Sequence, residues 1–235
     1  MAACSKGPGQ SMREYAVRAE FAPSTRLHLE DTSSPLVSGR YWKWSGDDVL
    51  TLTYSDGGDV ASCEPSSVRL DAEDGRYAVF TFKIPSSARA LSLEYGSELA
   101  FGKVCDGDID IPGEMVYARA VISAEAGEQN LPAGILQHRC SYLRIDPVVV
   151  GKVVRSILIS GTGLKGNVGV AGSISIPIEK TFPFWVAVCN EASAITVESV
   201  DSQGNKTLIA SLDDAGKGSC NLYEISYKPV IDYRK

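Results

Sequence analysis

Apolar side chains recur at every second position in many short stretches of the chain. In the first of these, Tyr15, Val17, Ala19 and Phe21 alternate with charged or small residues. A period of two predicts strands that bury one face and expose the other. The same alternation occurs in residues 50–54, 78–82, 91–95, 174–178, 182–188, 195–197, 208–210 and 223–227.

Two stretches depart from this alternation. Residues 153–159 are more continuously apolar, which predicts a central strand buried on both faces. Residues 116–126 fit either a short helix or a strand, and no segment keeps helical spacing for more than about two turns. Because turn sequences close the alternating stretches, for example at residues 55–58 and 202–205, the pattern predicts an all-β protein of sandwiches or barrels.

The best linker is the stretch of glycine, proline and polar residues at 126–134. It separates two parts that are each about the size of one β-sandwich. We therefore predict a flexible tether at 1–12, an N-terminal β-sandwich at 13–130 and a C-terminal β-sandwich at 131–235.

Composition narrows the function classes without choosing among them. The chain has 235 residues, of which 44% are hydrophobic and 22% charged, as in ordinary soluble domains. Its 22 glycines and 11 prolines indicate many turns and exclude a helical bundle. With 23 basic and 29 acidic residues the net charge is −6, which argues against a nucleic-acid partner.

Residues 161–166 have the GxGxxG form and follow a strand-like stretch. A dinucleotide site also needs a helix that opens at the last glycines, where it meets the pyrophosphate. Residues 167–173 have the pattern of a hairpin instead. We therefore expect no nucleotide cofactor at this loop.

Three aspartates, Asp106, Asp108 and Asp110, are spaced like the start of a calcium loop. Such a loop needs glycine at its sixth position and glutamate at its twelfth. The chain has Ile111 and Tyr117 there, so we expect a solvated acidic turn and no metal site.

The sequence offers little for catalysis. Its histidines are His28 and His138, and neither a GxSxG elbow nor an HExxH zinc motif is present. His28 alternates with Leu27 and Leu29, which suggests the outer face of a strand. We predict that the protein is not an enzyme and has no catalytic residues; a hydrolase built around His28 or His138 is the weakest alternative.

Trp42 and Trp44 flank Tyr41 and allow two interpretations. They could form a platform on which a sugar stacks, or they could anchor the early part of the chain to the core, since large aromatic residues dominate core burial.

The six cysteines have no regular spacing. Cys4 follows small residues, and the sequence from Met1 to Ser5 resembles the end of a bacterial lipoprotein signal peptide. We predict that Cys4 is lipidated and that the polar residues after it form the tether. The other five are an odd number, which disfavours a full disulfide framework. Cys140 and Cys189 lie in apolar stretches, so we expect buried thiols.

A family pattern follows from the order of several segments. They are residues 44–49 (WSGDDV), 74–80 (DGRYAVF), 136–145 (LQHRCSYLRI), 153–157 (VVRSI), 164–166 (LKG) and 184–188 (FWVAV). Over residues 13–228 the chain resembles the fimbrillin-like (Mfa-like) family of Bacteroidetes cell-surface lipoproteins, which are the subunits and anchors of type V pili.

The resemblance implies two tandem transthyretin-like Greek-key β-sandwiches and a lipoprotein of the outer membrane, exposed at the cell surface or in a fimbrium. It also implies assembly by β-strand exchange: a trypsin-like protease cuts after an arginine that follows the first strand, and a strand of a neighbouring subunit replaces the one that leaves. Here the first strand is about 14–21, and the candidate cleavage points are Arg26 and Arg40. The alternative role of each arginine is solvated loop charge.

Little chain follows Tyr227 that could serve as a donor strand, so we expect an accessory, tip or anchor subunit. Its partners would be other pilus subunits and a ligand on a host or bacterial surface, and no cofactor is expected. The alternative function is a surface glycan-binding lipoprotein that uses Trp42, Trp44 or Trp185.

Overall fold

The computed structural model of the chain describes residues 11–22, 26–29, 44, 46–70, 77–106, 111, 113–122, 133–147, 154–165, 172–177, 183–212 and 221–227. In these parts of the chain the fold is all-β, and its only helices are two single 3₁₀ turns. No helix in the same residues is long and apolar enough to cross a membrane. The all-β prediction is therefore confirmed.

The chain forms two compact units, and it passes between them several times. The strands of unit 1 are β1 (Met12–Phe21), β3 (Leu50–Asp56), β4 (Asp59–Cys63), β5 (Ser67–Leu70), β6 (Ala78–Pro85), β7 (Arg89–Tyr95), β9 (Ala118–Ile122) and β10 (Gly134–His138). The elements of unit 2 are β2 (Arg26–Leu29), η1 (Glu98–Ala100), β8 (Val104–Asp106), η2 (Gly113–Met115), β11 (Cys140–Pro147), β12 (Val154–Thr162), β13 (Ser173–Pro177), β14 (Phe184–Cys189), β15 (Ser193–Asp201), β16 (Lys206–Leu212) and β17 (Asn221–Tyr227).

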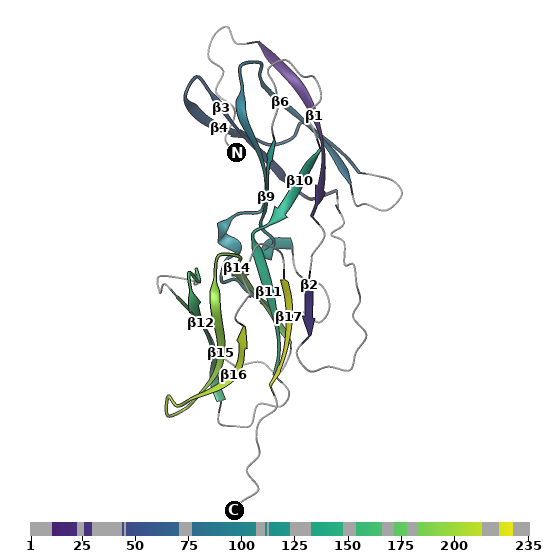
Figure 1. Cartoon of the computed structure of the whole chain (residues 1–235). Coiled ribbons are helices and arrows are strands. Elements are labelled where there is room, and N and C mark those ends of the chain that lie inside the picture. Colours follow the sequence, from purple (N-terminus) through teal and green to yellow (C-terminus); the bar gives the residue numbers. More distant parts are fainter. Residues whose placement is uncertain are drawn as a thin grey trace, which may run out of the picture. The chain divides into compact units, whose positions relative to one another are not determined.

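Unit 1 is one eight-stranded sheet in the order β4-β3-β7-β9-β10-β1-β6-β5. The sheet curls, because β3 and β4 contact β6 although they lie far from it in the strand order (Figure 1). Leu50 and Leu52 of β3 therefore share one buried core with Phe80 and Phe82 of β6. In each strand these residues occupy alternate positions, as the period of two predicts.

Unit 2 contains a five-stranded sheet, β2-β17-β11-β14-β8, and a four-stranded sheet, β13-β12-β15-β16. The two sheets adjoin where β16 contacts β17. The three central strands of the larger sheet come from the second half of the chain, whereas both edge strands come from the first half. In Figure 1, β2 runs beside β17 at one of these edges.

The burial of two strands, β12 and β14, differs from what the sequence predicts. β12, expected to be buried on both faces, alternates between buried and partly exposed residues, as a strand with one covered face does. β14, expected to be half-buried, is buried at all six positions. Strand β14 lies inside its sheet, between β11 and β8, and the backbone N–H of Gly102 donates to the carbonyl of Ala187 at 2.8 Å.

Each unit is built from several separate segments of the chain, whereas the sequence analysis predicts the consecutive ranges 13–130 and 131–235. The segment at 136–145 is divided at Arg139: its first part is β10, in unit 1, and its second part is β11, in unit 2. The ambiguous stretch near 116–126 contains strand β9. Most of the expected linker lies outside the described residues, and the division into independently folding domains stays a prediction.

The GxGxxG segment contains a hairpin connection, as expected. Gly161 N–H donates to the carbonyl of Gly172, and Gly172 N–H donates to the carbonyl of Leu164, both at 3.1 Å. Gly163 has φ +71°, a conformation that favours glycine.

Candidate strand-exchange site

Strand β1 pairs with two neighbouring strands, with one over most of its length and with the other only at its end. It pairs antiparallel with β6 along eight positions, from Met12 opposite Pro85 to Ala19 opposite Ala78. It pairs parallel with β10 only at its end, where Ala19, Glu20 and Phe21 lie opposite Gly134, Ile135 and Leu136. Almost all of the sheet hydrogen bonds of β1 are therefore made to one strand.

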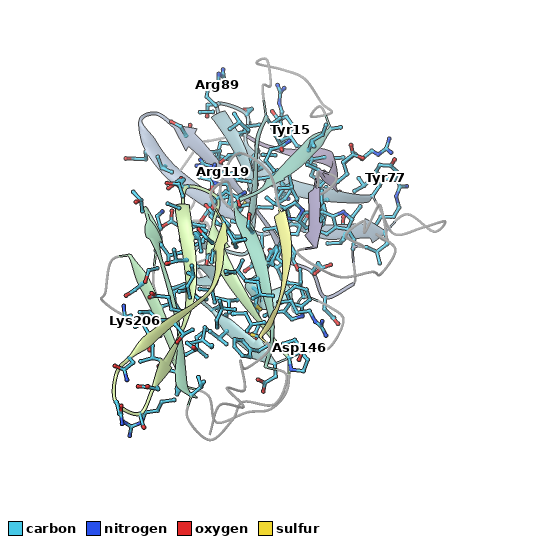
Figure 2. The ribbon with its side chains drawn as sticks, turned by 60° about the horizontal axis from the view of Figure 1, so that its bottom comes forward. Tyr15, Tyr77, Arg89, Arg119, Asp146 and Lys206 are labelled. Atoms are coloured by element: carbon cyan, nitrogen blue, oxygen red, sulfur yellow. The ribbon has the colours of Figure 1, made fainter. Side chains whose placement is uncertain are left out.

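The inner face of β1 belongs to the core of unit 1. Tyr15 is 7% exposed, and Val17 and Ala19 are fully buried. The outer face carries Glu14, Arg18 and other polar residues, as the sequence alternation predicts. The Arg18 guanidinium lies 3.7 Å from the centre of the Tyr77 ring, a cation–π contact on the outer face. Figure 2 labels Tyr15 and Tyr77.

An aromatic cluster surrounds Phe21, the last residue of β1. Its ring stacks on Trp44 with centroids 4.7 Å apart and on His138 with centroids 5.4 Å apart. Tyr95 meets the Phe21 ring edge-on at 5.2 Å. Offset-stacked and edge-on pairs are the favourable arrangements of aromatic rings. The end of β1 is thus fixed by ring contacts to three other parts of unit 1.

Burial shifts the pKa values of the two titratable groups of this cluster, His138 and Tyr95. Burial lowers the pKa of His138 to about 4, so its imidazole is neutral at physiological pH. Burial, followed by a hydrogen bond to Asp48, raises the pKa of Tyr95. The Tyr95 hydroxyl donates to Asp48 Oδ1 at 2.6 Å. The cluster therefore presents neutral rings to Phe21.

Gly134 determines how closely β10 can approach the core beside β1. A Cβ added at Gly134 would lie 2.5 Å from Leu93 Cδ1, and Leu93 is fully buried. Neither Gly134 nor the contact of Phe21 with His138 was singled out by the sequence analysis. The only sequence signal for Gly134 is its place at the end of the glycine-containing linker stretch.

Removal of β1 would open unit 1 in a specific way. The edge of β6 that now pairs with Met12–Ala19 would lose its partner, and the apolar sites filled by Tyr15, Val17, Ala19 and Phe21 would be exposed. Unpaired backbone beside an apolar groove accepts a strand from another chain. β1 and the groove beneath it are the candidate site.

The predicted processing and lipidation residues lie elsewhere. Arg26 is the first residue of β2, and its backbone is in register with Asn221 of β17. Cleavage at Arg26 would therefore act at the start of a paired strand. Arg40 and Cys4 lie outside the described residues.

The structure places two of the three candidate sugar-binding tryptophans, Trp44 and Trp185, in the interior. Trp44 is 4% exposed and contacts Phe21, Phe80 and Tyr95, and Trp185 is 1% exposed. A stacking platform must present a ring face to solvent, so neither residue serves as one. Trp42 lies outside the described residues.

The two histidines belong to different units. His28 belongs to β2 of unit 2, whereas His138 is buried in unit 1 against Phe21. In the described part of the chain, no group of three or more His, Cys, Asp or Glu residues could hold a metal ion.

The structure is thus that of an all-β protein in which strand β1 packs its apolar face into the core of a curled sheet. No family model matches the sequence, and no curated protein matches it. Among solved structures, the chain is similar to the tip fimbrial protein Mfa3 of Porphyromonas gingivalis, with 13% identity, a TM-score of 0.38 and coverage of 85% of this chain and 81% of that one.

Two further solved structures are similar to the chain at the same sequence identity. The fimbrial anchor protein Mfa2 of P. gingivalis matches with 13% identity, a TM-score of 0.40 and coverage of 86% and 83%. A fimbrial protein of Bacteroides ovatus matches with 13% identity, a TM-score of 0.36 and coverage of 93% of this chain and 49% of that one. All three TM-scores lie below 0.5.

Proposed function

We propose that the protein is an accessory, tip or anchor subunit of a cell-surface fimbria and that it assembles by exchange of strand β1. The observation that carries the proposal is the position of β1. Strand β1 buries Tyr15, Val17 and Ala19 in the core of unit 1 and pairs over eight positions with β6, but it pairs with β10 over only three.

The groove sets the chemistry of the donor strand. Burial of a side chain the size of Val or Phe stabilises by about 1.5–3 kcal/mol. The loss of Tyr15, Val17 and Phe21 together would cost several such contributions, so β1 stays bound until a replacement supplies equivalent contacts. A suitable donor carries apolar residues at alternate positions, with a small one at the place of Ala19.

The finer parts of the proposal follow from the family resemblance. Each unit is a transthyretin-like sandwich, and Cys4 carries a lipid that holds the protein in the outer membrane. Cleavage after Arg26 or Arg40 releases β1. The partners are other fimbrial subunits and a ligand on a host or bacterial surface.

Treatment of the full-length protein with an arginine-specific protease tests this function. We expect an N-terminal fragment that ends at Arg26 or Arg40, a folded body, and oligomers on size-exclusion chromatography. The variants Arg26→Lys and Arg40→Lys keep the charge but remove each cleavage point in turn. The variant that blocks fragment release identifies the processing site.

A competing peptide separates strand exchange from nonspecific association. A peptide of residues 11–22 in excess should keep the cleaved protein monomeric, because it refills the groove. The same peptide with Val17→Asp should not, because it would bury a charge at a fully buried position. A cleaved protein that remains monomeric without any peptide would refute self-assembly of the shaft type, and an anchor subunit that receives its donor strand from another protein would then remain.

A further inference from the structure

Cys140 and Cys189 lie directly opposite each other on neighbouring antiparallel strands. They are paired in the register of β11 with β14, which continues to Ile145 opposite Phe184. Both residues are therefore at the same end of the ladder and on the same face of the five-stranded sheet.

A backbone hydrogen bond identifies the type of this pair. The N–H of Asn190, which follows Cys189, donates at 3.0 Å to the carbonyl of Arg139, which precedes Cys140. In an antiparallel ladder, a bond between the flanking residues makes the enclosed pair a non-hydrogen-bonded one. In such pairs the Cα atoms are about 4.5 Å apart and the side chains come closest.

This spacing meets the requirement for a disulfide. A disulfide needs Cα atoms about 4.4–6.8 Å apart and Cβ atoms about 3.5–4.5 Å apart. Both cysteines are free thiols in the structure, and the pairing places their backbones at a separation that a disulfide can span without movement of either strand. Of the other cysteines that the structure describes, Cys105 lies opposite Trp185, and Cys63 belongs to unit 1.

We propose that Cys140 and Cys189 form a disulfide across β11 and β14 when the chain folds in the presence of a small-molecule disulfide. One cysteine thiolate attacks the oxidant and forms a mixed disulfide, which releases one thiol. The second thiolate then attacks the protein sulfur of that mixed disulfide and releases a second thiol. Two protein thiols are oxidised, and one disulfide is reduced to two thiols.

Burial determines when this bond forms. Both cysteines are fully buried, and the Cys189 thiol donates to the carbonyl of Gly163 at 3.2 Å. An oxidant reaches them while the strands are pairing and is excluded afterwards. The same burial protects the finished bond from reductants, as expected of a structural disulfide.

The crosslink would stabilise unit 2 because it closes a long loop. The loop between Cys140 and Cys189 contains β12 and β13. Closing a long loop lowers the entropy of the unfolded chain and so favours the folded state. β1 and its groove belong to unit 1, so this inference does not depend on the proposed strand exchange.

The test refolds the full-length protein with oxidised and reduced glutathione, and in parallel with a reductant alone. Each sample is then denatured, alkylated without reduction, digested and analysed by mass spectrometry. We expect a crosslinked peptide pair that contains Cys140 and Cys189 in the first sample only. The oxidised protein should melt about 4–16 °C above the reduced one.

Single cysteine variants show which residues cause that difference in melting temperature. Cys140→Ala and Cys189→Ala should each abolish it, whereas the control Cys63→Ala should keep it. If a variant fails to fold, the peptide analysis of the unaltered protein still decides. Full alkylation of both cysteines after oxidative refolding, or a crosslink from either one to a different cysteine, would overturn the proposal.

Discussion

The ring of Phe21 stacks on the ring of His138, with centroids 5.4 Å apart and an angle of 20° between the planes. Phe21 ends strand β1, and His138 ends strand β10. The contact therefore joins β1 to a buried histidine, and the burial of that histidine makes the stability of unit 1 depend on pH.

Acidification to pH 5 should destabilise the protein through His138. Its pKa is about 4 in the folded state, because of burial, and 6.5 otherwise. The unfolded chain therefore binds the proton first, and stability is lost as the pH falls from about 6.5 towards 4. From the two pKa values, the free energy of unfolding should fall by about 2 kcal/mol between pH 7 and pH 5. Urea unfolding at both values measures this.

The variant His138→Phe is the control for this pH dependence. It keeps a ring against Phe21 and removes the titration, so the slope between pH 7 and pH 5 should flatten. Glu114 and Asp201 have lowered pKa values, owing to hydrogen bonds to their carboxylates, so their contributions are lost at lower pH. A variant with the same slope as the unaltered protein would contradict the assignment.

Gly134→Ala should destabilise unit 1. The new methyl group would lie 2.5 Å from Leu93 Cδ1, and the fully buried Leu93 side chain would have to shift within the core. Overpacking of this kind costs about 1–3 kcal/mol. Gly46→Ala is the matched control, since its Cβ would meet nothing within 4 Å, and its effect should stay within about 0.5 kcal/mol. Equal denaturation midpoints for the two variants would show that the contact is unimportant.

Val17→Ser should weaken the hold of the sheet on β1. Val17 is fully buried, so the change removes apolar contacts and buries a hydroxyl, at a cost of about 2–4 kcal/mol. Arg18→Ser, one residue further on the exposed face, loses the contact with Tyr77 and should cost less than about 1 kcal/mol. Chemical denaturation measures both, and the reverse order would mean that β1 does not face the core as described.

Iodide should quench tryptophan fluorescence weakly in the variant Trp42→Phe. The tryptophans that remain, Trp44 and Trp185, are 4% and 1% exposed, so a hydrated anion does not reach them. For the same reason, titration with polysaccharides should give no saturable shift of their emission. Strong quenching, or a saturable shift with a defined sugar, would restore the glycan-binding alternative.

The alternation of apolar residues was sufficient to find most strands. The stretches that contain Tyr15, Phe80 and Ile176 all form strands with the expected buried positions. This works because the period of two is a local property, which each strand carries in its own residues. The burial of Cys140 and Cys189 was likewise visible from the apolar residues around them.

The candidate site was predicted only in part. The sequence placed a strand at 14–21, but the aromatic cluster around Phe21 brings together Trp44, Tyr95 and His138, which are far apart in the chain. Local patterning contains no information on such contacts, because they depend on which strands become neighbours and on how the sheet curls. The same holds for the register that places Cys140 opposite Cys189.

By itself, the sequence determined that this protein is all-β, where most of its strands run, and which face of each strand is apolar. The tertiary structure decided the partners: β1 with β6 and β10, the early strands β2 and β8 at the two edges of a sheet from the second half of the chain, and the division of residues 136–145 between two units. The physical reason is that a strand can satisfy its backbone hydrogen bonds with any neighbour of suitable register. Only the packing of all the apolar faces together selects one set of neighbours.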